Sequence, residues 1–169
     1  MPKKVLVICG ATASGKTRLA VDCALKLNTE IISADSQLIY KGLNIGTAKP
    51  TKEEMRGVKH HMIDVVEPTE TFSVSDYSEM ALHILEKLIS EGKTPIICGG
   101  TGFYINSLLF DLGYGNAPAD ESIRAKYTDF LEKNGKDALF NKLKEVDPET
   151  AEVLHPNDTK RVIRALEIF

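Results

Sequence analysis

The sequence predicts an α/β protein in which helices flank a parallel sheet, followed from near residue 112 by a helical insertion. Three observations carry this prediction. Short apolar runs alternate with amphipathic helical stretches through the first part of the chain, which is typical of parallel strand–helix units. A glycine-rich turn joins the first apolar run to the first helical stretch. After Leu109, glycines and Pro118 mark a loop, and from Asp120 onward the pattern is helical only.

The first elements follow from their residue patterns. Lys4–Cys9 and Glu30–Ser33 are short apolar runs rich in valine or isoleucine, which predict buried strands. The helix expected between them, Thr17–Leu27, places five apolar residues on one face: Leu19, Ala20, Cys23, Ala24 and Leu27.

The middle of the chain is less regular. Lys41–Pro50 contains glycines and predicts a loop, after which Thr51–Glu54 resembles a capping box that starts a short helix. His61–Val66 predicts a strand that stops before Pro68.

A long helix is expected over Ser73–Ile89, with Gly92 near its end and Thr94–Cys98 as the next strand. The apolar stripe of this helix is Tyr77, Ala81, Ile84, Leu85 and Leu88. Four helices are expected after the loop: Asp120–Asn134, Lys136–Glu145, Pro148–Val153 and Thr159–Phe169.

Composition excludes several classes of protein. The 169 residues are 43% hydrophobic and 27% charged with a net charge of −3, which argues against disorder and against a globally basic coat for nucleic acid. No apolar run approaches the ~18–20 residues of a membrane span. The run Val5–Cys9 is shorter than the ~7–15 residues of a secretion signal, so we expect a cytoplasmic protein. Three cysteines without a close pair predict free thiols, with Cys9 and Cys98 buried.

One motif carries specific chemistry. Residues 10–17 satisfy G-x-x-x-x-G-K-[ST], with a strand leading in and a helix leading out. Glycines let backbone N–H groups turn toward a phosphate, Lys16 would bridge phosphate oxygens, and Thr17 would offer its hydroxyl to Mg²⁺. The motif predicts a P-loop NTPase-like sheet that binds nucleotide and, by itself, favours a small-molecule or nucleotide kinase that uses ATP. The expected phosphate-binding residues are Gly10, Ala11, Thr12, Ala13, Ser14, Gly15, Lys16 and Thr17.

Asp35 follows the second strand and would emerge beside the phosphate loop. Its position allows three roles: a turn or cap residue, a carboxylate linked to Mg²⁺, or a general base. Thr94–Cys98 continues into Gly99-Gly100-Thr101 and not into an aspartate, which weakens an ATPase hypothesis.

Two smaller groups allow alternatives. His60 and His61 could ligate a metal, but no cysteine or carboxylate stands at ligand spacing, so a structural or phosphate-facing role is favoured. Three aromatic residues could stack on a base or a prenyl chain, and core packing is at least as well supported for each: Tyr40, Phe103 and Tyr104.

Ordered blocks of sequence accompany the phosphate loop: Asp35–Tyr40, Asn44–Pro50, His60–Asp64, Gly99–Tyr104 and His155–Glu167. Together they run from residue 10 to 167 and resemble the tRNA dimethylallyltransferases, also called tRNA isopentenyltransferases. The resemblance implies an Mg²⁺-dependent, monomeric enzyme that transfers a dimethylallyl group from dimethylallyl diphosphate. The acceptor would be N6 of an adenosine beside the tRNA anticodon, and pyrophosphate would leave.

The resemblance also assigns roles to residues. Asp35 would act on the adenine amine as base or orienting acceptor, and Thr101 and Arg124 would contact the tRNA near the reacting nucleotide. We therefore expect Asp35, Thr101 and Lys16 to be catalytic. The residues expected to contact the tRNA anticodon stem-loop are Asp35, Ser36, Gln37, Leu38, Thr101, Arg124, Lys160, Arg161, Val162, Ile163 and Arg164.

Local charge and chain length complete the expectations. Residues 41–61 carry five basic and two acidic side chains, and residues 156–164 carry three basic and one acidic side chain. We therefore expect any RNA contact to be made by these two stretches and not by the whole surface. Members of the resembled family are longer, and this chain ends inside an expected helix. We therefore expect an N-terminal portion with an α/β core (1–111) incomplete at its C-terminal side and a helical segment (112–169). Its terminal apolar residues would be uncovered: Ala165, Leu166, Ile168 and Phe169. The alternatives are a small-molecule or nucleoside kinase and a non-catalytic phosphate-binding fragment.

Overall fold

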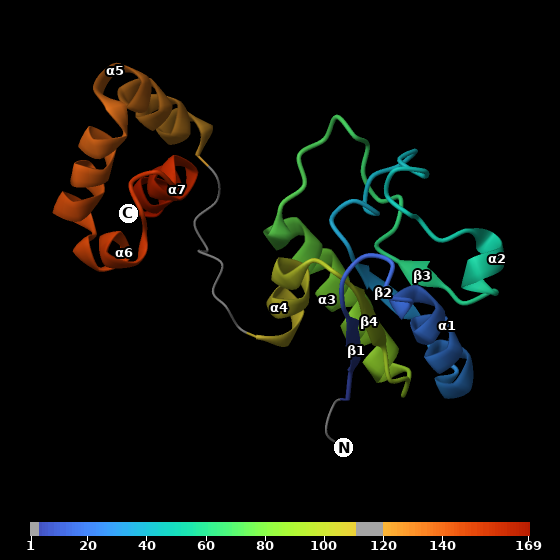
Figure 1. Ribbon diagram of the computed structural model, residues 1–169. Helices are drawn as coiled ribbons and strands as arrows, with labels where there is room; N and C mark the ends of the chain where they lie inside the picture. The colour runs from blue at the N-terminus through green and yellow to red at the C-terminus, as the bar shows by residue number, and fades with distance from the viewer. Residues whose placement is uncertain (1–3, 111–119) are drawn as a thin grey trace. The chain divides into compact units, whose positions relative to one another are not determined.

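Residues 4–110 and 120–169 are described by the computed structural model, and the chain separates into two units, Met1–Tyr114 and Gly115–Phe169 (Figure 1). The predicted boundary between residues 111 and 112 lies outside the described residues. Each unit has a hydrophobic core of its own.

Four parallel strands form the sheet of the first unit in the order β1 (Leu6–Cys9), β4 (Ile96–Gly99), β2 (Ile31–Ala34) and β3 (His60–His61). Parallel strands expose their carboxyl ends at one edge of the sheet, where α/β proteins bind ligands. The predicted α/β class is therefore confirmed, with β4 between the first two strands of the chain.

Helices cover both faces of this sheet (Figure 1). Helix α1 (Lys16–Leu27) packs on one face against Ile8, Ile31 and Ile96. On the other face α3 (Val74–Ser90) and α4 (Gly102–Leu109) enclose a core that includes Ile32 and Ile97. The alternation of side chains along each strand explains the two cores, because neighbouring residues point to opposite faces.

Local sequence signals place two of the helices. Thr51 and Glu54 form the expected capping box of α2 (Lys52–Met55), with bonds of 3.2 and 2.9 Å. Ser73 and Asp76 form another at the start of α3. In the predicted apolar stripe of α3, Ile84 is partly buried. The other four members are buried: Tyr77, Ala81, Leu85 and Leu88.

The strand predicted over His61–Val66 is wrong beyond its first residue. Met62 and Asp64 have φ values of 61° and 56°, which turn the chain out of the extended conformation. The last residue of the predicted strand, Val66, forms an isolated parallel β-bridge with Tyr40.

Two burial predictions and one element also differ. Leu19 and Leu27 of α1 are exposed and Cys23 is only partly buried, whereas Val21 joins Ala20 and Ala24 in the core. Cys9 is exposed because it lies at the carboxyl end of β1, although Cys98 is buried as expected. Helix α4, which follows Thr101 directly, was not among the predicted elements.

The second unit contains α5 (Glu121–Val146), α6 (Pro148–Val153) and α7 (Thr159–Ile168). Gly135, with φ 80° and ψ 169°, breaks α5 into the two helices that the sequence predicts. Leu166 packs in the core of this unit, so the expectation that it is uncovered is wrong, whereas Ile168 and Phe169 are exposed. None of the helices in the described ranges combines the length and hydrophobicity that crossing a bilayer requires.

A charged network lies at the start of β2. Glu30 accepts hydrogen bonds from Lys93 Nζ at 2.9 Å and contacts His61 Nε2 at 2.6 Å. The bond from Lys93, opposed by burial and assisted by His61, lowers the pKa of Glu30 to about 2. His60 contacts the Val58 carbonyl at 2.9 Å, so both histidines have structural partners.

This network gives a prediction for stability. Glu30→Gln should lower the free energy of unfolding at pH 7 by about 1–3 kcal/mol, because Lys93 and His61 lose a charged partner. Since the folded pKa is about 2 and the ordinary value is 4.5, the difference from wild type should shrink as pH falls from 4.5 toward 2. Urea unfolding at several pH values measures it, with the exposed Glu86→Gln as the matched control. A deficit independent of pH would contradict the assignment.

Candidate functional site

The phosphate loop lies between β1 and α1, as the motif predicts. Ala13 and Gly15 have φ values of 62° and 81°, and Ser14 N donates to the Ala11 carbonyl at 3.4 Å. Lys16 Nζ reaches back over the loop to the same carbonyl at 3.0 Å. The N-cap residue of α1 is Gly15, which has no side chain to accept a hydrogen bond from the first turn. The partial positive charge of this helix N-terminus favours binding of an anion there.

Asp35 follows β2 directly and Thr101 follows β4 after Gly100, and the structure brings the two segments together. Ser36 N donates to Thr101 Oγ1 at 3.0 Å, and Thr101 N donates to the Ala34 carbonyl at 3.0 Å. Asp35 Oδ1 accepts the Gln37 N–H at 2.9 Å. Asp35 therefore lies in a turn that its own carboxylate stabilises, and the residues on either side of it are hydrogen-bonded to Thr101.

At Gly99 and Gly100 the backbone after β4 passes close to the end of β2 and to the start of the phosphate loop. A Cβ on Gly99 would lie 2.0 Å from the Ala34 carbonyl oxygen, and one on Gly100 would lie 3.3 Å from the carbonyl oxygen of Gly10. The sequence contains the Gly-Gly pair, but its role requires the sheet order, which places β4 between β1 and β2.

Cys98 lies within electrostatic reach of the predicted catalytic charges. Burial raises the pKa of its thiol to about 11, an effect that Lys16 opposes and Asp35 increases. Its Sγ is 3.8 Å from the Lys16 carbonyl oxygen. The raised pKa favours the protonated thiol at neutral pH, and Cys98 packs in the core between α1 and the sheet.

The aromatic residues divide between core and surface. Tyr104 is buried and stacks on Tyr77, with ring centroids 3.8 Å apart and planes 4° apart. The Tyr77 hydroxyl donates to the Ser33 carbonyl at 2.9 Å, and burial raises the pKa of this hydroxyl. Core packing therefore explains Tyr104, whereas Phe103 is 65% exposed and Tyr40 is partly buried.

A pair of residues without a predicted role supports the Asp35 segment. Lys49 Nζ donates to Asp64 Oδ1 at 2.5 Å and to the Tyr40 carbonyl at 2.9 Å. The Asp64 N–H donates to the Leu38 carbonyl at 3.1 Å. Sequence spacing could not reveal this pair, because the left-handed turns at Met62 and Asp64 bring it together.

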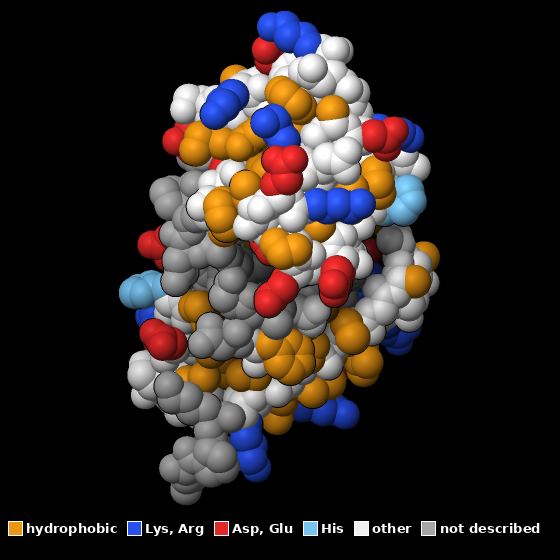
Figure 2. Space-filling view, turned by 90° about the vertical axis from the view of Figure 1, so that its left-hand side faces the viewer, with side chains coloured by type: hydrophobic (Ala, Val, Ile, Leu, Met, Phe, Trp, Pro, Cys, Tyr) orange, Lys and Arg blue, Asp and Glu red, His pale blue; other side chains and the backbone are white. Residues whose placement is uncertain are grey.

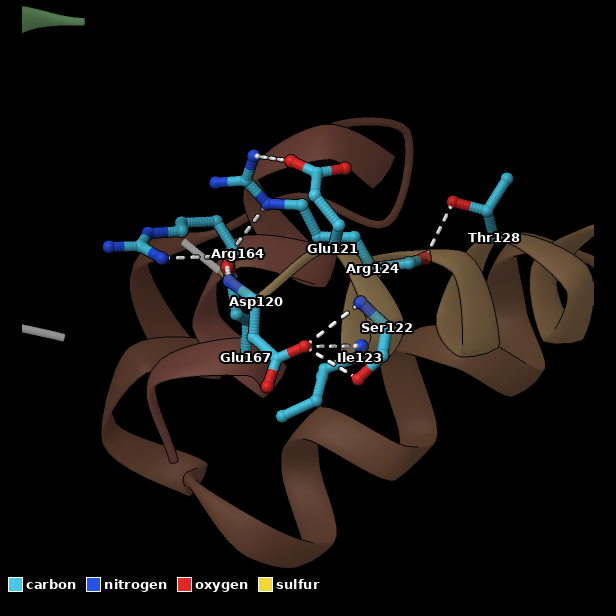
Figure 3. Close-up of polar contacts among 8 residues, drawn as sticks. All are labelled: Asp120, Glu121, Ser122, Ile123, Arg124, Thr128, Arg164 and Glu167. Carbon is cyan, nitrogen blue, oxygen red and sulfur yellow. Dashed lines mark hydrogen bonds and ion pairs between the residues drawn. The ribbon is translucent and has the colours of Figure 1, made fainter. Parts of the chain in front are cut away.

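In the second unit, Arg124 and Arg164 converge on one carboxylate (Figure 3). Glu167 lies 3.0 Å from Arg124 Nε and 2.7 Å from a terminal nitrogen of Arg164. The resembled block contains Glu167, but no role was assigned to it from sequence.

The predicted contact stretch 160–164 is only partly at the surface. Lys160 and Arg161 are exposed, and Ile163 is partly buried. Val162 is 1% exposed and its side chain packs in the core of the unit, so the prediction that this stretch contacts tRNA depends on its other residues. Helical periodicity explains this, since one residue in each turn of α7 must face the core.

Surface charge is mixed. On the face drawn in Figure 2, Lys and Arg side chains are interspersed with Asp and Glu and do not form one basic patch.

Comparisons with known proteins agree with this arrangement. A sequence model described as IPP transferase matches residues 38–169. A tRNA dimethylallyltransferase of Acetivibrio thermocellus is 52% identical over 165 residues, covering 98% of this chain and 53% of the relative. One from Caldanaerobacter subterraneus subsp. tengcongensis is 50% identical over 169 residues, covering 100% and 54%.

Solved structures give the same result. The full-length tRNA isopentenylpyrophosphate transferase of Bacillus halodurans matches with a TM-score of 0.66 and 44% identity, over 98% of this chain and 55% of that chain. A eukaryotic dimethylallyltransferase acting on tRNA matches with a TM-score of 0.81 and 36% identity, over 98% and 41%. The chain spans about half the length of the curated relatives it matches. Because the family model matches residues 38–169 and the Acetivibrio relative is 52% identical over 98% of the chain, the chain belongs to the IPP transferase family.

Proposed function

We propose that this chain provides the diphosphate-binding and proton-accepting site of a tRNA dimethylallyltransferase. The proposal rests on one observation: the carboxyl ends of β1, β4 and β2 lie next to one another in the sheet. The phosphate loop, Asp35 and Thr101 follow three strands that end at one edge of the sheet. The Ser36–Thr101 hydrogen bond joins the segments after β2 and β4, and Gly100 lies close to Gly10 at the start of the loop. The names of the curated relatives supply the reaction.

The reaction forms a bond between adenine N6 and C1 of the dimethylallyl group while the C1–O bond to pyrophosphate breaks. Adenine N6 is a poor nucleophile because its lone pair is delocalised into the ring. Asp35, held by the Gln37 N–H through Oδ1, accepts the N6 proton as the C–N bond forms, a role worth about 10²–10⁴-fold. Lys16 and the N–H groups of the loop stabilise the charge that develops on the leaving pyrophosphate.

Mg²⁺ fits the donor set only together with a diphosphate. The described residues contain no group of three His, Cys, Asp or Glu side chains that could hold a metal, whereas the partly buried Thr17 hydroxyl stands at the start of α1. Mg²⁺ is commonly held by one or two protein oxygens plus substrate phosphates. When bound there, the ion would neutralise charge on the diphosphate.

The acceptor we propose is the tRNA anticodon stem-loop, since a solved relative is described as acting on tRNA. Thr101 and Arg124 would contact the tRNA near the reacting nucleotide, and Asp35–Leu38 and the exposed part of 160–164 would provide further contacts with the RNA. A loop base is less costly to extrude than a paired one. The protein would work as a cytoplasmic monomer.

Label transfer tests this function. The chain is incubated with Mg²⁺, unmodified tRNA and dimethylallyl diphosphate labelled in its allylic group. We expect label on N6 of an adenosine beside the anticodon. Absence of label would contradict the proposal, and ATP consumption stimulated by a small acceptor would favour a kinase instead.

Lys16→Ala should weaken binding of pyrophosphate in the presence of Mg²⁺ by about 10- to 100-fold. The physical reason is the loss of one hydrogen bond to a charged phosphate. Isothermal titration calorimetry measures it, with the same substitution at the exposed Lys26, on the last turn of α1, as the control. Equal dissociation constants for wild type and Lys16→Ala would remove Lys16 from the diphosphate site.

A further inference from the structure

The carboxylate of Glu167 is enclosed by its partners. Its side chain has no exposed surface. Oε1 accepts the Asp120 N–H at 2.7 Å, and Oε2 lies 3.0 Å from Arg124 Nε and 2.7 Å from a terminal nitrogen of Arg164. Burial acts to raise the pKa of Glu167, but Arg164, the Asp120 N–H and Arg124 outweigh it, and the pKa lies below its ordinary value. A charged carboxylate is therefore built into the interior of this unit.

The two arginines come from different helices. Arg124 lies on the first turn of α5 and Arg164 lies on α7, and their side chains are 38% and 33% exposed. Figure 3 shows the outer nitrogens of both guanidinium groups on the same side of the cluster. A guanidinium has five N–H donors in a planar fork, so one edge can bind a carboxylate while another edge faces solvent.

We propose that Glu167 is a positioning residue for RNA binding, which fixes Arg124 and Arg164 as a pair of phosphate-binding groups. This inference rests on the proposed function, since it takes tRNA as the ligand. Long side chains lose freedom when they bind, and a partner that has already ordered them reduces that cost. The neighbouring Glu121 binds Arg124 at 3.2 Å but is largely exposed, so it constrains the guanidinium far less.

Considered by charge alone, removal of Glu167 would strengthen RNA binding. Glu167 is an anion next to a site for another anion, so its removal raises the net charge of the chain from −3 by one unit. Simple electrostatic attraction would then strengthen RNA binding. A positioning role predicts weaker binding in spite of the added positive charge.

The experiment compares Glu167→Gln with Glu132→Gln, which makes the same charge change at an exposed position of α5. Fluorescence anisotropy with a labelled anticodon stem-loop at fixed ionic strength gives the dissociation constants. We expect Glu167→Gln to bind about three- to tenfold more weakly, the range that ordering a side chain implies. Glu132→Gln should bind as well as wild type or more tightly. The salt dependence of Glu167→Gln should also become shallower, as after loss of a phosphate contact. Equal or tighter binding by folded Glu167→Gln would overturn the inference.

Arg124→Lys provides a second measurement, because it keeps the charge but removes the Nε–H that Glu167 holds. It changes a partly exposed side chain, so folding is less at risk than with Glu167→Gln. We expect weaker RNA binding here too, and binding equal to wild type would overturn the inference if Glu167→Gln does not fold.

In the double variant Glu167→Gln/Arg124→Lys, the loss should be smaller than the sum of the two single losses, because Glu167 acts through Arg124. Strictly additive losses would overturn the proposed coupling. If wild type itself does not bind the RNA, the proposed function fails and this inference fails with it. Binding by wild type with no effect of either single variant contradicts the inference alone.

Discussion

Asp35→Asn should lower kcat for dimethylallyl transfer by about 10²–10⁴-fold, the contribution of a positioned proton acceptor. The asparagine carbonyl can still accept the Gln37 N–H that Asp35 Oδ1 accepts at 2.9 Å, so the turn should persist. The amide cannot take the N6 proton. Dissociation constants for tRNA and pyrophosphate should therefore change little, and single-turnover label transfer with separate binding titrations measures the difference.

Two controls make the Asp35 result specific. Asp137→Asn, on an exposed position of α5, makes the same chemical change and should leave kcat unaltered. Asp35→Ala removes the turn contact as well, so it should lose kcat and also some affinity for tRNA. A fall in tRNA affinity with unchanged kcat in Asp35→Asn would show that Asp35 binds substrate and accepts no proton.

Gly99→Ala should destabilise the first unit by about 3 kcal/mol or more, beyond the usual cost of an added methyl group in a packed core. The new Cβ would lie 2.0 Å from the Ala34 carbonyl oxygen, a backbone atom that cannot rotate away. β2 and β4 would have to separate where Thr101 N bonds to that same carbonyl, so the Asp35–Thr101 arrangement should be lost together with stability. Urea unfolding and pyrophosphate titration measure the two effects.

Gly102→Ala is the matched control for Gly99. It lies three positions further along the chain, in α4, where an added Cβ meets nothing within 4 Å. It should be neutral or slightly stabilising, because alanine favours helix more than glycine does. Equal stability of Gly99→Ala and Gly102→Ala would contradict the close approach of β2 and β4.

Local sequence signals predicted the parts of the fold that depend on local physics. The capping box at Thr51, the break at Gly135 and the loop around Lys16 each depend on a few neighbouring residues. The prediction of a strand at His61–Val66 was wrong because Met62 and Asp64 adopt left-handed conformations. Neither position holds a glycine or an asparagine, which would have indicated such a conformation. Tertiary hydrogen bonds to Leu38 and Ile39 accompany that turn, and hydrophobic pattern does not encode them.

The candidate site was predicted residue by residue but not as an arrangement. The motif identified Lys16 and Thr17, and the resemblance identified Asp35 and Thr101. The sequence could not supply the contact between Ser36 and Thr101, which are separated by 65 positions. It also gave no sign that Glu167 is buried, since a glutamate near the end of a helix is usually exposed.

The place of β4 between β1 and β2 also bears on how the protein is made. During synthesis β1 and β2 emerge early but are not neighbours in the described sheet. β2 can pair with β3, whereas β1 pairs with Ile96–Gly99 of β4, which is made later. Contacts between distant positions form slowly, and unpaired strand edges invite association with other chains. The nascent chain therefore carries β1 without its neighbour until its first hundred or so residues have left the ribosome. Of the strands that the structure describes, β4 is made last, and its arrival brings the ends of β1 and β2 together at the candidate site.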